Sequence, residues 1–183
     1  MIKSLKTQRL IIRPLQQTDT GALFHLYKEQ NAETVSGFTA FKNLEAAGKY
    51  VAGLIGMNKT GLSYHWAIEL ADQKTVVGFC NFYLPAPHLI GLRCCETAYG
   101  LLVPHQKLGY MHEALTECIK FMIKQNGFYR FEASVSPMNP ASMILLEKLG
   151  FVKEGLQRKK WLSGAERHDM LAYALLADAL RSD

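Results

Sequence analysis

The chain lacks the features that would direct it into or across a membrane. None of its 183 residues lies in an uninterrupted apolar run approaching the roughly 18 residues of a membrane-spanning helix. The first six residues carry lysines but no apolar stretch behind them, so we expect no secretory signal. With 49% hydrophobic and 20% charged residues, the sequence predicts a single cytoplasmic domain over residues 1–183, with its core at about residues 7–177.

The cysteines and histidines also lack the spacings that are typical of redox motifs, disulfides or metal sites. Cys80, Cys94, Cys95 and Cys118 form no C-x-x-C pair, and adjacent cysteines are poorly placed for an ordinary disulfide. We therefore expect reduced thiols. The six histidines show neither H-x-x-x-H nor H-E-x-x-H spacing, so no metal site is expected. The net charge of +5 favours an anionic ligand. We expect no direct binding of nucleic acid or membrane.

The order of periodic segments predicts a layered α/β (α+β) fold. Strand patterns occur at residues 9–14, 63–70, 75–84, 96–103, 131–135, 151–161 and 168–176. Helix patterns occur at residues 18–30, 43–57, 109–125 and 139–150. These elements predict a mixed seven-stranded sheet flanked by helices. A right-handed crossover through the third helix would join two parallel strands, at residues 96–103 and 131–135.

The segment most informative about a ligand is residues 104–113, Pro-His-Gln-Lys-Leu-Gly-Tyr-Met-His-Glu, between a strand and a helix. A loop that enters a helix presents unpaired N–H groups at the positive end of the helix dipole, where a pyrophosphate binds well. Gly109 would let the ligand approach the backbone closely. The Walker pattern is absent. Alone, this segment predicts an anion site or simply a tight turn.

This loop resembles the cofactor motif of a known family. Gln106-x-x-Gly109-x-Met111 is similar to the Q/R-x-x-G-x-G/A motif of the GNAT superfamily of N-acetyltransferases. Two positions depart from the pattern, because Met111 replaces a small residue and Leu108 replaces a residue that is often basic. The Met111 side chain either points into the helix–sheet core and leaves the backbone cradle intact, or narrows the phosphate site.

Three further segments resemble one branch of that superfamily, which contains the ribosomal-protein alanine and serine N-terminal acetyltransferases. Residues 139–155 are similar to its N-x-x-S-x-x-x-x-E-K-x-G-F-x-x-E-G stretch. Residues 7–13 resemble its opening T-x-R-L-x-L-R strand, and residues 96–101 resemble the strand before the cofactor loop. The resemblance covers residues 7–176, nearly the whole chain.

The resemblance implies direct transfer of acetyl from acetyl-CoA to an amine in a ternary complex, on a largely antiparallel sheet whose two central parallel strands splay apart. Pantetheine would lie along Leu101, Leu102 and Val103. The residues implied at the phosphates are Gln106, Lys107, Leu108, Gly109, Tyr110 and Met111. Holding both reactants together would supply much of the rate.

Catalytic roles follow from the same resemblance. Asn139 would contact pantetheine and Ser142 would donate a proton or hydrogen bond to the departing thiolate, although the pair could instead be a simple helix cap and a surface serine. Other branches of the superfamily have a tyrosine that acts as the catalytic acid one helical turn after the position of Ser142, and this sequence has Leu146 there. Glu96 and Glu132 are the candidate bases, or they pair with basic neighbours. Tyr99 and Trp66 would line the acceptor cleft or belong to the core.

The acceptor is left open by the sequence. We expect a protein or peptide N-terminal amine, whose reference pKa of roughly 7.7–8.0 makes a strong base unnecessary. The alternatives are a small amine, such as an amino acid, polyamine or antibiotic, and a non-catalytic CoA-binding module. Residues 37–61, which would border the acceptor site, match no specific motif. Either a monomer or a homodimer is compatible with the sequence.

Overall fold

The computed structural model describes residues 2–29, 41–84, 93–163 and 165–180. Its strands are β1 (Leu5–Lys6), β2 (Leu10–Pro14), β3 (Ser63–Leu70), β4 (Val76–Tyr83), β5 (Cys94–Leu101), β6 (Arg130–Val135), β7 (Val152–Ser163) and β8 (Glu166–Leu176). Its α-helices are α1 (Thr20–Glu29), α2 (Leu44–Thr60), α3 (Tyr110–Asn126) and α4 (Pro140–Lys148). Within the described ranges, no helix is long and apolar enough to cross a membrane.

All eight strands join in one sheet of order β1-β2-β3-β4-β5-β6-β8-β7, and only the β5–β6 pair is parallel. The predicted mixed, largely antiparallel sheet is confirmed. The eighth strand is β1, a two-residue segment that pairs with β2 and is too short to give a periodic signal. Helix α3 makes the predicted crossover between the two parallel strands.

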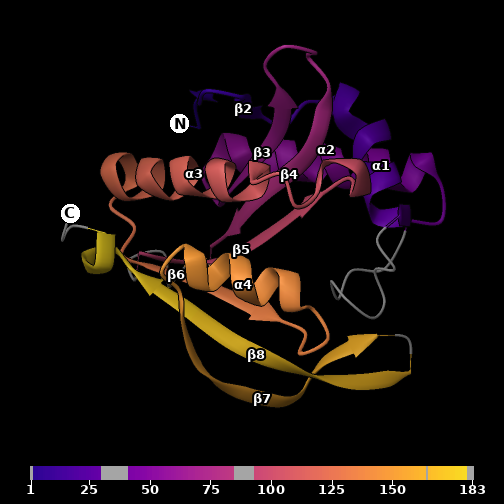
Figure 1. The fold of residues 1–183 in the computed structure, drawn as a ribbon. Helices are drawn as coiled ribbons and strands as arrows, with labels where there is room; N and C mark the ends of the chain where they lie inside the picture. The colour runs from indigo at the N-terminus through magenta and orange to yellow at the C-terminus, as the bar shows by residue number, and fades with distance from the viewer. Residues whose placement is uncertain (1, 30–40, 85–92, 164, 181–183) are drawn as a thin grey trace.

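Helices cover both faces of the sheet (Figure 1). Because side chains alternate along a strand, Trp66 and Ile68 face α3, whereas Ala67 faces the opposite layer. The core beneath α3 and α4 includes Leu115, Ile119, Met122 and Leu146. The core beneath α1 and α2 includes Leu23, Leu26, Val51 and Leu54. The sheet thus lies between two apolar cores.

Helices α2 and α3 both end at a left-handed glycine, which was predicted for α3, whereas α2 runs three residues past its predicted end at residue 57. Asn43 caps α2 by accepting from the Ala46 N–H at 2.9 Å, and Gly61 ends it with a φ of 71°. Helix α3 ends at Gly127, whose φ is 66°. The left-handed backbone conformation at these positions favours glycine, because the Cβ of any other residue would lie too close to the following carbonyl oxygen.

A buried histidine on β3 makes stability depend on pH. The His65 ring is fully buried and hydrogen-bonds to Ser63 Oγ at 2.8 Å and Asn81 Oδ1 at 3.0 Å. Burial lowers the pKa of His65 to about 4, against a partly opposing hydrogen bond to Asn81. The unfolded chain binds this proton near pH 6.5. The contribution of the neutral His65 ring to the free energy of unfolding is therefore fully present above pH 6.5 and is lost as the pH falls toward 4.

We expect the free energy of unfolding to fall by up to about 3 kcal/mol between pH 6.5 and 4 through this residue. Urea unfolding across that range would measure the loss. The His65→Gln variant, although less stable throughout, should show a flatter pH dependence. Substitution of the exposed His112 by Gln serves as the control and should leave the wild-type slope intact. An equal slope in His65→Gln and wild type would contradict the assignment.

Candidate functional site

The two central strands, β5 and β6, pair over only three residues and then separate. Cys94, Cys95 and Glu96 lie opposite Arg130, Phe131 and Glu132. Beyond Glu96, β5 continues along β4 as far as Leu101, while β6 continues along β8 as far as Val135. Figure 1 shows the resulting wedge between β5 and β6. The β4–β5 register has no shift, so the strands separate without a β-bulge in β5.

The backbone N–H and C=O groups of every second residue of β5 face this wedge. Leu102 N–H donates to Val77 O on the β4 side at 2.9 Å, whereas Arg93 O accepts from Tyr129 and Arg130 on the β6 side. Since backbone groups alternate in direction along a strand, Thr97, Tyr99 and Leu101 direct theirs toward β6. The wedge is thus an opened parallel ladder, in which backbone groups of β5 beyond Glu96 are no longer paired with β6.

The predicted strand boundary at Val103 is wrong, because β5 ends at Leu101. The Leu102 amide is occupied by Val77, and Val103 begins a short 3-10 turn that ends at His105. The Val103 side chain is 55% exposed. Pro104 lies in this turn, where its fixed φ suits the 3-10 conformation better than a strand. The amides of β5 that face the wedge are therefore those of Thr97, Tyr99 and Leu101, and of the predicted stretch 101–103 only Leu101 is among them.

The start of α3 has the geometry of an anion site. Gly109 is its N-cap with a φ of 82°, and it offers no side chain to cap the first turn. The first intrahelical bond runs from Glu113 N–H to Gly109 O at 3.1 Å. The preceding amides, those of Tyr110, Met111 and His112, lie at the positive end of the helix dipole. An anion that accepts from them would complete the cap.

The residues before Gly109 shape the loop. The Gln106 side chain donates to Leu101 O at 3.0 Å and so ties the loop to the end of β5. Lys107 adopts a left-handed φ of 61° and is exposed. Gln106 thus has a structural contact in the protein alone, whereas the Lys107 ammonium is available to an anion.

Met111 belongs to the core. Its side chain is only 7% exposed, and the Cys80 thiol lies 3.7 Å from its sulfur. Methionine fills irregular gaps easily because it is unbranched and flexible. Of the two alternatives for this departure from the motif, the structure supports the one in which the side chain points inward. The backbone cradle is left intact.

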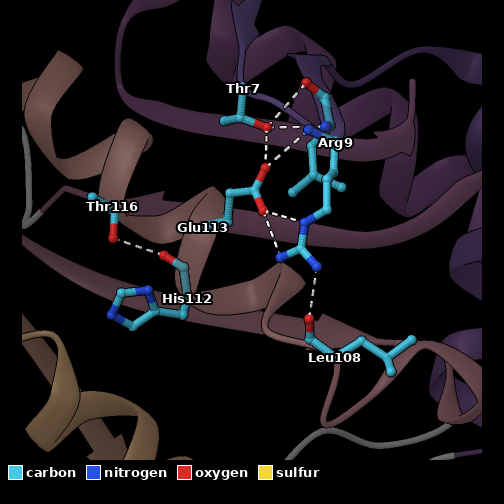
Figure 2. A network of polar contacts seen from close by, with 7 residues as sticks. Thr7, Arg9, Leu108, His112, Glu113 and Thr116 are labelled. Atoms are coloured by element: carbon cyan, nitrogen blue, oxygen red, sulfur yellow. Dashed lines mark hydrogen bonds and ion pairs between the residues drawn. The ribbon is translucent and has the colours of Figure 1, made fainter. Parts of the chain in front are cut away.

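An arginine that the sequence analysis did not assign to the site holds the loop in place (Figure 2). Arg9 donates through Nε to Glu113 Oε2 at 2.7 Å and through Nη1 to Leu108 O at 3.0 Å. Its guanidinium also stacks on the Tyr110 ring, 4.6 Å from the centroid. Thr7 Oγ1 donates to the same Glu113 carboxylate. These three hydrogen bonds and one ring contact join the segment between β1 and β2 to the loop and to α3.

This clamp also lies against the glycine. A Cβ added at Gly109 would come within 3.4 Å of the Arg9 guanidinium. Burial raises the pKa of Glu113, but hydrogen bonds from Thr7 and Arg9 outweigh it and hold the pKa below its usual value. The carboxylate stays ionised and keeps Arg9 in place. The only signal in the sequence was the T-x-R opening, which carries no spacing relation to residue 113.

Helix α4 brings Ser142 to the wedge. The Asn139 side chain caps α4 by accepting from Ser142 N–H at 3.1 Å, as its N-cap position predicts. Ser142 Oγ lies 2.7 Å from the Tyr99 hydroxyl, which reaches it from β5. Leu146, at the position where other branches place a tyrosine, is fully buried. Trp66 is likewise a core residue, with no exposed surface.

The two candidate bases lie side by side in register on the parallel pair, on the sheet face opposite Ser142. Glu132 is paired with Arg130 at 2.7 Å and is therefore partly neutralised. Among the described residues, no ion pair or hydrogen bond engages the exposed Glu96 carboxylate. Tyr83 is its neighbour on β4. Of the two carboxylates, Glu96 is the one left available to a ligand.

The site fits an extended ligand with an anionic end. Thr97 Oγ1, on the first β5 residue past the paired segment, is buried and has no hydrogen-bond partner in the described structure. Buried hydroxyls are normally satisfied, so an unsatisfied one beside an open ladder indicates a missing partner. The wedge would hold an amide-containing chain, and the α3 start would hold its phosphates. Among the described residues, no group of three or more His, Cys, Asp or Glu residues could hold a metal ion.

Comparison with known proteins agrees with this geometry. The family profile described as acetyltransferase (GNAT) domain matches residues 9–152. The chain is 26% identical over 177 residues to the uncharacterized N-acetyltransferase YoaA of Bacillus subtilis, covering 96% of this chain and 98% of that protein. It is 28% identical over 178 residues to the ribosomal protein uS5-alanine N-acetyltransferase of Escherichia coli, covering 93% and 89%.

Solved structures share the fold. The ribosomal-protein-S5-alanine acetyltransferase of Vibrio fischeri superposes with a TM-score of 0.83 at 19% identity, covering 97% of this chain and 98% of that one. The spermidine N-acetyltransferase of Vibrio cholerae, in complex with CoA and spermine, gives 0.81 at 16% identity, covering 94% and 98%. The family profile spans more than half of the chain. The chain belongs to the GNAT family of acetyltransferases, and it is an N-acetyltransferase that uses acetyl-CoA.

Proposed function

We propose that the chain acetylates the N-terminal α-amine of a protein or peptide, acting as a single cytoplasmic domain. The observation that supports this best is the placement of two groups across the wedge. Ser142 lies on the face covered by α3 and α4, whereas Glu96 lies on the opposite face. An acetyl group held between the separated strands would have a proton donor on one side and a base on the other.

The wedge and the helix start would hold the donor. Backbone groups of β5 that face the wedge would pair with pantetheine, and one N–H would donate to the thioester carbonyl as negative charge develops there. The amides of Tyr110, Met111 and His112 would bind the pyrophosphate, with Lys107 beside it. Asn139 would lie near pantetheine at the start of α4. Acetyl-CoA itself supplies the activated thioester.

The chemistry would then be a single displacement at the carbonyl carbon. The amine nitrogen forms the new C–N bond, and the C–S bond breaks with its electron pair passing to sulfur. Glu96 takes the proton that the amine loses and afterwards releases it to solvent, while Ser142 gives its proton to sulfur and regains one from solvent. Positioning of both reactants in one complex supplies much of the acceleration. Glu132, engaged by Arg130, has no part in these steps.

The protein acceptor is supported by a relative, the uS5-alanine acetyltransferase of Escherichia coli, which aligns over nearly the whole chain. A small amine is the second candidate. Two neighbouring carboxylates, Glu96 and Glu132, would lie on the acceptor side, and such groups attract a polycation. The fold of the chain is also similar to that of a spermidine N-acetyltransferase, and this similarity makes a polyamine a specific alternative acceptor.

Mass spectrometry of acetylated products tests the choice of acceptor. Peptides beginning with alanine or serine, the same peptides with a blocked N-terminus and one internal lysine, and spermidine would each be incubated with acetyl-CoA. We expect a gain of one acetyl group on the free N-terminus only. Product from spermidine alone would establish the second candidate. Tight acetyl-CoA binding with no product from any acceptor would support a non-catalytic module.

A further inference from the structure

Tyr99 makes the closest side-chain contact to the proposed proton donor. Its hydroxyl lies 2.7 Å from Ser142 Oγ and so bridges β5 and α4 across the wedge. We propose that Tyr99 is a positioning residue that fixes the direction of the Ser142 hydroxyl and leaves its hydrogen for the departing sulfur. This inference rests on the proposed function, because it assigns a role in the same transfer step.

Ser142 is held at two points. Its backbone N–H donates to Asn139 Oδ1 at 3.1 Å, which fixes where the residue enters α4. That bond leaves the side chain free to rotate among its rotamers. The Tyr99 hydroxyl supplies the second contact from a different element, and only this one acts on the Oγ atom. Asn139 thus places the residue, and Tyr99 would place its hydroxyl.

The direction of the hydrogen bond follows from acidity. A phenol with an ordinary pKa of about 10 is a better donor than an aliphatic alcohol, whereas the alcohol oxygen is a good acceptor. Burial raises the pKa of Tyr99 further, against an opposing effect of Ser142. The phenol therefore keeps its proton across the physiological range. When Tyr99 donates to Oγ, the Ser142 hydrogen cannot point back at Tyr99 and must serve another acceptor.

The arrangement also accounts for the missing tyrosine on α4. Leu146 lies one turn after Ser142 on α4, is fully buried and carries no hydroxyl, so the phenol at this site has to come from another element. Tyr99 comes instead from β5, where the strand alternation directs its side chain to the α3/α4 face. Here the phenol acts through Ser142 rather than on sulfur directly.

The kinetic test is a double-mutant cycle on acetyl transfer. Tyr99→Phe removes one hydroxyl and keeps the ring. We expect the single-turnover rate to fall about tenfold, the effect of one hydrogen bond, while the KM for acetyl-CoA stays within about twofold. In the Ser142→Ala background, Tyr99→Phe should change the rate by less than about twofold, because the two residues act as one unit.

A binding measurement gives a readout that needs no turnover. Ultraviolet thiolate absorbance would be titrated for bound CoA, with acetyl-CoA-bound protein subtracted to remove the contribution of cysteines. A correctly directed Ser142 hydroxyl stabilises the thiolate and lowers the thiol pKa of bound CoA. We expect Tyr99→Phe to raise that pKa by about one unit, and to have no effect when Ser142 is already alanine.

Tyr129→Phe is the matched control, because it removes a hydroxyl bonded to Asp178 at 2.8 Å, on another part of the chain. It should leave the rate and the thiol pKa unchanged. An equal loss from Tyr99→Phe in both backgrounds, or a raised KM with an unchanged rate and thiol pKa, would overturn the positioning role. A wild-type protein that transfers no acetyl would instead overturn the proposed function, and this inference with it.

Discussion

Replacement of Glu96 by Gln is expected to lower kcat/KM for a peptide acceptor about 100-fold at pH 7. General-base catalysis typically contributes between about 100-fold and 10,000-fold, and the lower value suits an α-amine that is already partly neutral at that pH. The deficit should shrink by up to about tenfold as the pH rises to 9, since the ammonium then loses its proton to water. Initial rates over pH 6 to 9 would measure both effects.

Glu132→Gln is the matched control for this experiment. The two carboxylates are neighbours in register on the same sheet face, but Glu132 is bound by Arg130 and Glu96 has no such partner in the described structure. We expect Glu132→Gln to change kcat/KM by less than about threefold. A reversed order of the two losses would assign the base to Glu132. Equal and small losses would show that neither carboxylate removes the proton.

Gly109→Ala is expected to weaken acetyl-CoA binding about 100-fold. At a φ of 82° an L residue is strained, and its Cβ would also contact Arg9 and occupy the approach of a phosphate to the backbone. Displacing the phosphate from the helix start would lose one or two hydrogen bonds to a charged group, each worth about 1.5–3 kcal/mol. Isothermal titration calorimetry with acetyl-CoA measures the change.

Gly127→Ala separates ligand binding from backbone strain. Gly127 ends the same helix in the same left-handed conformation, with a φ of 66°, and an added Cβ there meets nothing within 4 Å. Both variants should lose a similar 1–2 kcal/mol or so of stability, but only Gly109→Ala should lose affinity for acetyl-CoA. Equal affinities in the two variants would place the phosphates elsewhere.

The fold was largely predictable because its signals are local. The periodic apolar segments located four helices and seven of the eight strands, and the strand–helix–strand order indicated the parallel pair. The end of β5 was misplaced by two residues, because Leu102 and Val103 are as apolar as the strand before them. The bond from Leu102 N–H to Val77 O prolongs the contact with β4 by one residue, and the 3-10 turn at Val103–His105, which contains Pro104, then ends the strand.

The site was predictable only in part. The glycine at the helix start and the Asn139–Ser142 cap have local signatures, since each depends on residues within one turn. The Arg9–Glu113 clamp and the Tyr99–Ser142 contact join residues that lie 104 and 43 positions apart. No periodicity or spacing rule encodes such pairs. The pairing state of Glu96 and Glu132 likewise follows from the sheet register.

Amide hydrogen exchange with and without acetyl-CoA tests the location of the donor site most directly. Acetyl-CoA should protect the amides of Thr97, Tyr99 and Leu101 in the wedge and those of residues 110–112 at the start of α3. Strand β3, which pairs with β2 over residues 66–70 and with β4 over residues 63–69, should exchange unchanged. Saturable binding of acetyl-CoA that protects neither of the two segments would contradict a donor held between β5 and β6 with its phosphates at the α3 start.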